Sequence, residues 1–429
     1  MTHVVMGSVP VPGHFGPVRT VAADLVRRGH RVTVITGSGF RTAVEEVGAE
    51  FVPLAGGADY DVQELVREID GRCIPNGLPR FDAELTALSV DPMSGQFTVL
   101  KDVLSRSVGE PVVVISEVAF WGAQPFLLGA AAPEHVKGFV TLGILPFAQS
   151  SIDTAPYGMC LPPDSSEEGR ARNREANVFV QTQALAGLQA KYEHTVRELG
   201  ATEEVPFALD AAALLPDHYL QLSIEELSYP RSDTPDPVRF VGALPAPKAD
   251  GELPGWWEDV LDADTVVVVC QGTLANQDFG ELIEPTVRAL EDAPVLVVAL
   301  TGREATLANL PANARVAEFI PFGAVLPHAD VLVSNGGFGG VQQALSFGVP
   351  LVLAGGKEDK PESNTRIAAT GAAVDLATGT PRTEAIRKAV DDVLGQQDYR
   401  NHARRLAALY AQTDALGEIA RAVDELSSR

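Results

Sequence analysis

The first 35 residues of the chain alternate between strand and helix patterns, and this alternation constrains the fold more than any other feature. His3–Met6 is a short apolar run of strand character, and apolar residues then recur at helical spacing over Val18–Val26. Gly29 suits the end of that helix, and Arg31–Ile35 is a second strand pattern. A strand, a helix and a strand in so few residues predict a βαβ unit, and hence a parallel sheet covered by helices on both faces.

The alternation restarts after Leu244–Gly255, a segment whose proline and glycine content is typical of an interdomain linker. We therefore predict an α/β protein with two doubly wound, Rossmann-like domains facing a central cleft. The N-terminal domain covers residues 1–243, the linker 244–255 and the C-terminal domain 256–429, whose last helix is a candidate to return to the first domain. Ligands of such sheets bind at the carboxyl ends of the strands.

The further elements predicted from apolar runs are listed by residue range. Before the linker, strands are expected at Glu50–Pro53, Val112–Ile115 and Val136–Leu142. After it, strands are expected at Val266–Cys270, Val295–Leu300, Ala314–Phe319, Asp330–Val333 and Pro350–Leu353, and helices at Leu282–Leu290 and Gly340–Phe347.

The composition disfavours several classes of protein. Lys and Arg number 33 against 57 Asp and Glu, and the resulting net charge of −24 disfavours a nucleic-acid partner. No apolar stretch approaches the ~20 residues of a membrane span, and the N-terminal run lacks the basic segment of a secretory signal. The cysteines, Cys73, Cys160 and Cys270, are too widely spaced for a metal knuckle or a disulfide framework. We expect a soluble, cytoplasmic protein with neither a bound metal nor a resident cofactor.

A glycine-rich segment is the strongest local signal. Ser334–Gly340 follows the predicted strand Asp330–Val333 and opens the next helix. Glycines let the backbone approach an anion closely, and the amides and dipole at a helix start favour negative charge. The segment lacks the lysine of a Walker A motif and the third glycine of a dinucleotide fingerprint, which disfavours an NTPase and a dehydrogenase. We predict an anion site here, with a tight glycine turn that binds nothing as the alternative.

Two more loops follow predicted strands of the C-terminal half. Gln271–Thr273 offers backbone amides and a hydroxyl to one face of a diphosphate, and an ordinary βα turn is the alternative. In Gly355–Glu362, Asp359 could accept hydrogen bonds from sugar hydroxyls and Lys360 could neutralise a phosphate. A charge run after a strand is also typical of solvated surface.

In the first half, His14 occupies the loop that joins the first strand to the first helix. There it would project into the predicted cleft, where its near-neutral pKa suits it to accept a hydroxyl proton. A carboxylate could orient the ring, and Glu117, at the end of the strand Val112–Ile115, is the best-placed candidate. The alternative is a histidine without a function, whose ring is exposed to solvent or has its hydrogen bonds satisfied within the protein.

Together these residues resemble the GT-B glycosyltransferases, in particular the family 1 enzymes that glycosylate small natural products, and the similarity spans nearly the whole chain. Its N-terminal part is carried by Gly13–Pro17, by Leu25–Thr33 and by the approach to the linker at Val238–Pro245. The resemblance implies that His14 is the general base and that Glu117 stands where the family usually has an aspartate.

The C-terminal half carries the part of the resemblance that concerns the sugar donor. Phe319–Phe322 resembles an aromatic-x-Pro-Gln segment that packs on the nucleobase, with phenylalanine in place of the glutamine. Asn335 stands where the family has a diphosphate-binding histidine, and Gln343 where many members have a ribose-binding glutamate. The pair Asp359–Lys360 corresponds to an Asp-Gln pair near the sugar. The donor-binding residues implied are Gln271, Gly272, Thr273, Phe319, Phe322, Asn335, Gly336, Gly337, Phe338, Gly339, Gly340, Gln343, Asp359 and Lys360.

The activity implied is the transfer of a hexose, with inversion and without a metal, from a UDP- or TDP-sugar to a hydroxyl of a small aromatic or polyketide-like acceptor. The nucleotide sugar is then a co-substrate, the chain a monomer or homodimer, and the reaction part of natural-product or antibiotic biosynthesis. Two other functions stay open: a non-catalytic auxiliary partner on the same fold, and a sugar-nucleotide epimerase or hydrolase. The candidates for the acceptor pocket, for which core packing is the alternative, are Phe81, Trp121, Phe147 and Tyr157.

Overall fold

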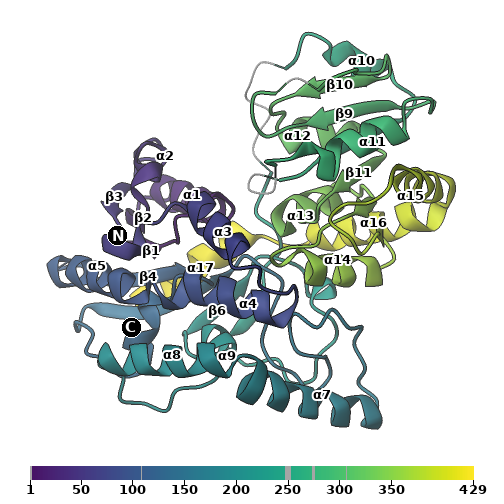
Figure 1. Ribbon diagram of the computed structural model, residues 1–429. Coiled ribbons are helices and arrows are strands. Elements are labelled where there is room, and N and C mark those ends of the chain that lie inside the picture. Colours follow the sequence, from purple (N-terminus) through teal and green to yellow (C-terminus); the bar gives the residue numbers. More distant parts are fainter. Residues whose placement is uncertain (1, 108, 247–252, 273–275, 306) are drawn as a thin grey trace. The chain divides into compact units, whose positions relative to one another are not determined.

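The computed structural model describes residues 2–107, 109–246, 253–272, 276–305 and 307–429, and the chain divides into two compact units (Figure 1). The first unit comprises Met1–Ser223, Pro230–Leu244 and Asp414–Arg429, and the second comprises Ile224–Tyr229 and Pro245–Thr413. The chain therefore enters the second unit briefly before the main crossing, and its C-terminal segment returns to the first.

A parallel sheet of seven strands forms the centre of the first unit, in the order β3-β2-β1-β4-β5-β6-β7. β1 and β4, near the middle of the sheet, are buried along their whole length because helices cover both faces. The strands are β1 His3–Gly7, β2 Arg31–Thr36, β3 Glu50–Pro53, β4 Val112–Glu117, β5 Val136–Gly143, β6 His218–Gln221 and β7 Val238–Phe240.

Alternating residues of β1 divide the core of this unit into two layers, as the period of a strand requires. Val4 and Met6 pack in one apolar cluster with residues of α1 and α17, whereas Val5 packs in another with residues of α5. In Figure 1 the yellow helix α17 lies among the purple and blue elements of the first unit. The helices are α1 Pro12–Arg27, α2 Arg41–Glu45, α3 Val62–Gly71, α4 Leu78–Leu85, α5 Met93–Arg106, α6 Gln124–Leu127, α7 Glu167–Phe179, α8 Ala186–Glu198, α9 Ala208–Leu214 and α17 Ala415–Ser427, with π-helical turns at Thr86–Val90 and Val180–Ala184.

The second unit repeats this design with six parallel strands in the order β10-β9-β8-β11-β12-β13. Val267 and Val269 of β8 pack with α11 and α15 on one face of this sheet. The strands are β8 Val266–Cys270, β9 Leu296–Leu300, β10 Ala314–Ala317, β11 Val331–Ser334, β12 Leu351–Leu353 and β13 Ala373–Asp375. The helices are α10 Trp257–Asp262, α11 Ile283–Ala289, α12 Phe322–Val325, α13 Phe338–Ser346, α14 Lys360–Ala369, α15 Thr383–Gly395 and α16 Gln397–Tyr410.

Two helices begin earlier than the sequence predicts. Residues 13–17 are expected to form a loop, but α1 starts at Pro12, so His14 lies in its first turn. Proline is well suited to a first helical turn because its φ is already helical and its missing N–H would have no partner there. Likewise α13 starts at Phe338 rather than Gly340, since Gly337 serves as the residue before the helix. The glycine-rich loop is thereby shortened to 335–337.

Three short strands were not predicted from the sequence. β6, β7 and β13 are three or four residues long, too short for an apolar run to distinguish them from loop. β7 lies within the segment that the sequence analysis assigns to the approach to the linker, and it forms an edge of the first sheet. No helix in the described part of the chain is long and apolar enough to cross a membrane.

Because α17 packs in the core of the first unit, we predict that it stabilises the fold. Leu426 of α17 is fully buried and packs in the main core of the first unit, against Gly138 of β5. We expect Leu426→Ala to lower the free energy of unfolding by about 2–5 kcal/mol, because it removes buried methyl groups and leaves a cavity. Chemical denaturation measures the change. Leu214→Ala, at a leucine that is 43% exposed, is the control, expected to cost about 0.5 kcal/mol or less; equal costs would contradict the prediction.

Candidate functional site

His14 and Glu117 meet at the carboxyl ends of β1 and β4. Nδ1 of His14 lies 2.9 Å from Oε2 of Glu117, with the imidazole side chain 15% exposed and the carboxylate fully buried. Since a carboxylate accepts, we assign the proton to Nδ1, and in the neutral ring Nε2 is then the basic nitrogen. The pair thus has the arrangement of a base and the group that orients it.

Glu117 is held by backbone as well as by the imidazole. Val9 N donates to Oε1 at 3.1 Å, and Ala119 N donates to Oε2 at 2.8 Å. A buried carboxylate is stable only when hydrogen bonds replace its lost hydration, and here three donors do so. Glutamate is one methylene longer than the aspartate that the family usually has here. These hydrogen bonds hold its carboxylate at a position from which it reaches His14.

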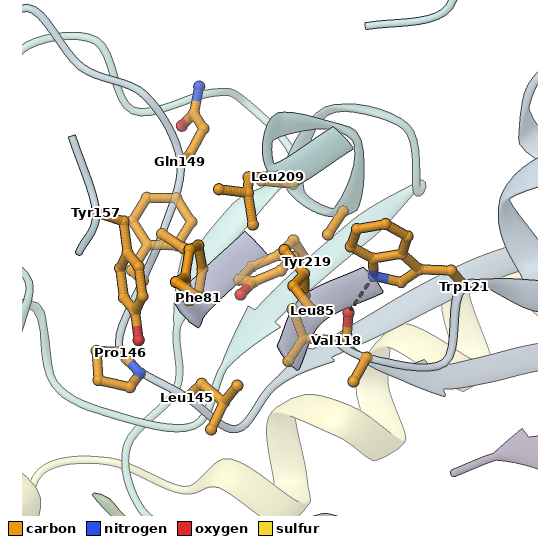
Figure 2. Close-up of a pocket in the computed structure, with 15 residues that line it drawn as sticks. Phe81, Leu85, Val118, Trp121, Leu145, Pro146, Gln149, Tyr157, Leu209 and Tyr219 are labelled. Atoms are coloured by element: carbon orange, nitrogen blue, oxygen red, sulfur yellow. Dashed lines mark hydrogen bonds between the residues drawn. The ribbon is translucent and has the colours of Figure 1, made fainter. Parts of the chain in front are cut away.

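The chain that leaves the carboxyl end of β4 lines an apolar cavity (Figure 2). Val118 and Ala119, the two residues that follow Glu117, line it, so one end of the cavity is next to the carboxylate in the chain. The fifteen lining residues carry no charge. They are Phe81, Leu85, Val118, Ala119, Trp121, Leu145, Pro146, Phe147, Ala148, Gln149, Tyr157, Leu209, Ala212, Ala213 and Tyr219.

All four aromatic residues chosen from the sequence, Phe81, Trp121, Phe147 and Tyr157, line this one cavity. Sequence reasoning missed most of the aliphatic lining, which comes from loops and from the short helices α4 and α9. Val118 and Ala119 could have been predicted from the sequence, because residues directly after a predicted strand lie at its carboxyl end, where ligands bind. Tyr219 lies on β6, a strand that the sequence analysis did not predict.

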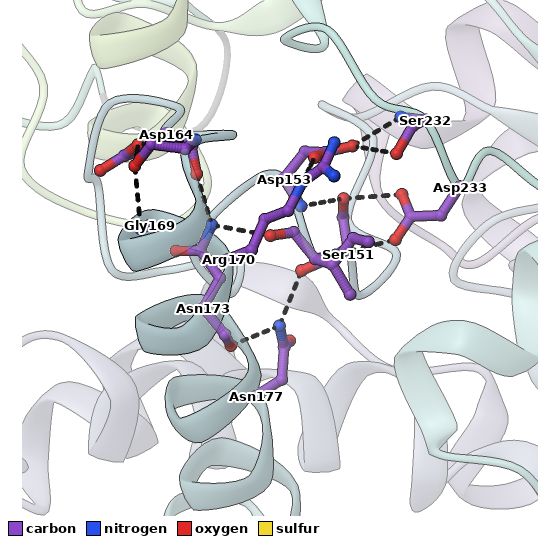
Figure 3. A network of polar contacts seen from close by, with 11 residues as sticks. Ser151, Asp153, Asp164, Gly169, Arg170, Asn173, Asn177, Ser232 and Asp233 are labelled. Carbon is purple, nitrogen blue, oxygen red and sulfur yellow. Dashed lines mark hydrogen bonds and ion pairs between the residues drawn. The ribbon is translucent and has the colours of Figure 1, made fainter.

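A network of polar contacts fixes the segment 145–157, which supplies six of the lining residues (Figure 3). Asp153 is its centre: Nε of Arg170 donates to Oδ1 at 2.7 Å, and both the amide and the hydroxyl of Ser232 donate to Oδ2 at 2.6 Å. Asp233 extends the network, because its carboxylate accepts from the hydroxyl of Ser151 at 2.7 Å and from Ile152 N at 2.8 Å. Hydrogen bonds from Ser232, supported by Arg170, hold the pKa of Asp153 below its ordinary value.

In the second unit, Asn335 lies in the loop between β11 and α13. Its amide nitrogen donates to the carbonyl oxygen of Gln271, which ties together the loops after β11 and β8. Its carbonyl Oδ1 is buried and has no hydrogen-bond partner among the described residues. Gly336 follows with φ +92°, and a Cβ there would clash with the side chain of Asn364, so this position requires glycine.

The start of α13 is open, since no side chain caps it. A Cβ added at Gly339 would meet nothing within 4 Å, whereas one at Gly340 would lie 3.2 Å from the ring of Phe322. Phe338 is buried and belongs to the apolar interior. The first turn of α13 therefore presents backbone rather than side chains.

The remaining donor candidates differ in exposure. Phe319 is 71% exposed and offers a free ring face, while Gln343 is half-buried on α13. The amide of Gln271 is engaged inside the protein, with Nε2 donating to Asp278 O at 2.9 Å and Oε1 accepting from Ile283 N at 2.9 Å. Thr273 lies outside the described residues.

The loop after β12 is less open than the sequence indicates. Lys360 is buried and its ammonium pairs with Glu358, a residue at φ +58°. Asp359 precedes α14 and its side chain does not cap that helix. Within the described ranges, no group of three or more His, Cys, Asp or Glu side chains is placed to hold a metal ion.

Comparison with known proteins gives matches along the whole chain. The family described as "Erythromycin biosynthesis protein CIII-like, C-terminal domain" matches residues 286–426. UDP-glycosyltransferase 2 of Phaeomoniella chlamydospora is 42% identical over 442 aligned residues, which cover 99% of this chain and 96% of the relative. The 4'-demethylrebeccamycin synthase of Lentzea aerocolonigenes is 36% identical, with 96% of each chain covered.

Solved structures share the fold at lower identity. The kitacinnamycin glycotransferase superimposes with a TM-score of 0.72 at 23% identity, covering 100% of this chain and 98% of that one. CalG4, the calicheamicin glycosyltransferase, superimposes with a TM-score of 0.70 at 21% identity, covering 100% and 99%.

The polar network around Asp153 generates a prediction. Asp153→Asn should lower the free energy of unfolding by about 1–3 kcal/mol at pH 7, because a hydrogen-bonded buried carboxylate is lost. Since folding lowers the pKa of Asp153, its contribution is complete above the ordinary pKa and disappears as the pH falls through the lowered value. The gap between wild type and variant should therefore close below about pH 4. Urea titrations at several pH values measure it.

The matched control is Asp102→Asn, which removes a surface ion pair with Arg106. Exposed pairs contribute little, so this variant should differ from wild type by less than about 1 kcal/mol at any pH. A gap for Asp153→Asn that stayed constant down to pH 2 would contradict the assignment.

Proposed function

The chain belongs to family 1 of the GT-B glycosyltransferases, the type that acts on natural products, and we propose that it transfers a hexose from a UDP- or TDP-sugar to a hydroxyl of a small apolar acceptor with inversion. The relatives named as UDP-glycosyltransferases favour UDP as the nucleotide. The observation that carries the proposal is the contact of 2.9 Å between His14 and Glu117, beside an uncharged cavity.

His14 is the general base in this proposal. Nε2 takes the proton of the acceptor hydroxyl as the oxygen attacks C1 of the sugar, and the bond from C1 to the diphosphate breaks on the opposite side. Glu117 keeps Nδ1 protonated and stabilises the imidazolium that forms. A single displacement of this kind inverts the anomeric centre.

The departing diphosphate is assigned to the loop 335–337 and the first turn of α13. The backbone amides there are uncapped, and the positive end of a helix stabilises an anion. The amide nitrogen of Asn335 carries two protons: one faces Gln271, and the second is the one we assign to a phosphate oxygen. Stabilising charge that develops on the leaving group is a large part of such catalysis.

The apolar cavity supports an acceptor that is itself apolar. Trp121, Phe147 and Tyr157 offer rings on which a flat molecule can stack. The non-catalytic alternative and the epimerase or hydrolase alternative have less support, because the relatives include named UDP-glycosyltransferases and because the contact between His14 and Glu117 suits a base that accepts a hydroxyl proton.

Removing the base tests the mechanism. His14→Ala should lower kcat by about 10²–10⁴-fold while the nucleotide-sugar Kd stays within about 2-fold, because the ring acts on the acceptor proton rather than on the donor. Glu117→Gln keeps the shape but removes the charge, and should lower kcat by a smaller factor. Mass spectrometry of products from several nucleotide sugars and a phenol panel measures transfer. Wild-type turnover by His14→Ala would remove the base assignment, and release of free sugar without adducts would favour a hydrolase.

Substitution of Asn335 tests the assignment of the diphosphate site in the second unit. Asn335→Ala should raise the Kd for the nucleoside diphosphate by about 10-fold, because one hydrogen bond to a charged oxygen contributes roughly 1.5 kcal/mol. Isothermal titration calorimetry measures the Kd. Asn401→Ala, at an exposed residue of α16, is the control. An unchanged Kd in Asn335→Ala would contradict the assignment.

A further inference from the structure

The acceptor cavity has two distinct ends. Val118 and Trp121 lie at the end next to Glu117, where the indole nitrogen of Trp121 donates to Val118 O at 2.9 Å. Phe81 and Tyr157 lie together toward the other end, as Figure 2 shows. We assign the reacting hydroxyl to the first end, because Val118 directly follows Glu117 in the chain and Glu117 contacts His14; the acceptor body then extends toward the second pair.

The far end is formed by two rings in contact. The ring centroids of Phe81 and Tyr157 are 5.4 Å apart and the planes are tilted by 39°. This separation is in the favourable range for aromatic pairs, and a third ring that joined them would gain similar contacts. The two residues come from different segments, Phe81 from α4 and Tyr157 from the segment held by the network around Asp153.

Helix α4 is held by both apolar packing and charge: Leu85 packs against the buried cluster that contains Trp121 and Tyr192, and an ion pair links the helix to α3. Arg80 is the only buried residue of this helix, all of which the structure describes. Its guanidinium pairs with Asp70 of α3 at 2.7 Å and with Glu84 of α4 at 2.6 Å. Gly77, at φ +87°, precedes the helix, and a π-helical turn follows it at Thr86–Val90. The ion pair between Arg80 and Asp70 thus helps to fix the turn of α4 that carries Phe81.

No charged side chain is among the fifteen described residues that line the cavity. The guanidinium of Arg231 is not one of them; it lies 4.9 Å from the centroid of the Phe147 ring and donates to the carbonyl oxygens of Phe147 and Gln149. The hydroxyl of Tyr219 is engaged with Gln221 at 3.2 Å. Moving a carboxylate or an ammonium from water into such surroundings is costly unless a partner is present. Charge on the acceptor body would therefore be rejected.

Resting on the proposed function, we propose that Phe81 and Tyr157 are the specificity-determining residues of the acceptor site, selecting acceptors whose body remote from the reacting hydroxyl is aromatic and uncharged. Arg80 is a positioning residue that acts through Phe81. The occupant is thus a phenol or alcohol with at least one further aromatic ring, and neither an aromatic acid nor a cationic amine.

The test measures binding of four phenols by calorimetry, so that it does not depend on transfer. The probes are phenol, 4-phenylphenol, 4'-hydroxybiphenyl-4-carboxylate and the methyl ester of that acid. Wild type should bind 4-phenylphenol and the ester at least 10-fold more tightly than phenol, and the carboxylate at least 100-fold more weakly than its ester.

Variants separate the far end from the rest of the cavity. Phe81→Ala and Tyr157→Ala should each raise the Kd for 4-phenylphenol by about 10-fold and the Kd for phenol by clearly less. Tyr157→Phe, which keeps the ring, should restore wild-type affinity. Arg80→Met should raise the Kd for 4-phenylphenol by about as much as Phe81→Ala does. Adding Arg80→Met to Phe81→Ala should raise this Kd little further. Phe179→Ala, at a phenylalanine 45% exposed on α7, is the control and should change nothing.

Equal losses for phenol and 4-phenylphenol in the alanine variants would overturn the proposal, as would equal binding of the carboxylate and its ester. An independent loss from Arg80→Met in the Phe81→Ala background would remove the positioning role. If the biphenyl series binds as expected but no sugar is transferred from any nucleotide sugar, the proposed function fails while the far-end assignment stands.

Discussion

The carboxyl edge of the first sheet is organised around one buried carboxylate. Glu117 ends β4 with both oxygens occupied, by the amides of Val9 and Ala119 and by Nδ1 of His14. Those amides belong to loops at the carboxyl ends of adjacent parallel strands, β1 and β4, so the sheet itself sets the geometry of the pair. A carboxylate so placed orients the imidazole, and the chain that follows it continues directly into the wall of the apolar cavity.

The two units present opposite kinds of surface at their candidate sites. In the first unit, aromatic and aliphatic side chains line the cavity, and hydrogen bonds to Asp153 and Asp233 hold the segment that supplies six of the lining residues. In the second unit, backbone is presented instead. Gly336 is at positive φ against Asn364, and α13 begins without a side-chain cap, so backbone amides are presented there, a kind of surface that favours an anion.

Much of this could be predicted from the sequence, for identifiable reasons. Central strands of a doubly covered sheet are continuous apolar runs, so β1, β2, β4 and β8 were found within a residue or two at each end. His14 and Glu117 follow such strands, and chain order alone then brings them to one edge. Short edge strands such as β6 and β7 carry no such signal. The aliphatic lining of the cavity was also missed, because it comes from loops and from α4 and α9, whose inner faces are defined only by what packs on them.

The sequence by itself determined the α/β architecture, the family and the residue types at the strand ends, because these depend on local periodicity and on motifs of fixed spacing. Only the tertiary structure decided which aromatic residues share a cavity, that the ammonium of Lys360 is committed to Glu358, and that α17 packs on the first sheet. Such facts depend on contacts between residues far apart in the chain. Burial and pairing are properties of the folded surroundings, and no local pattern encodes them.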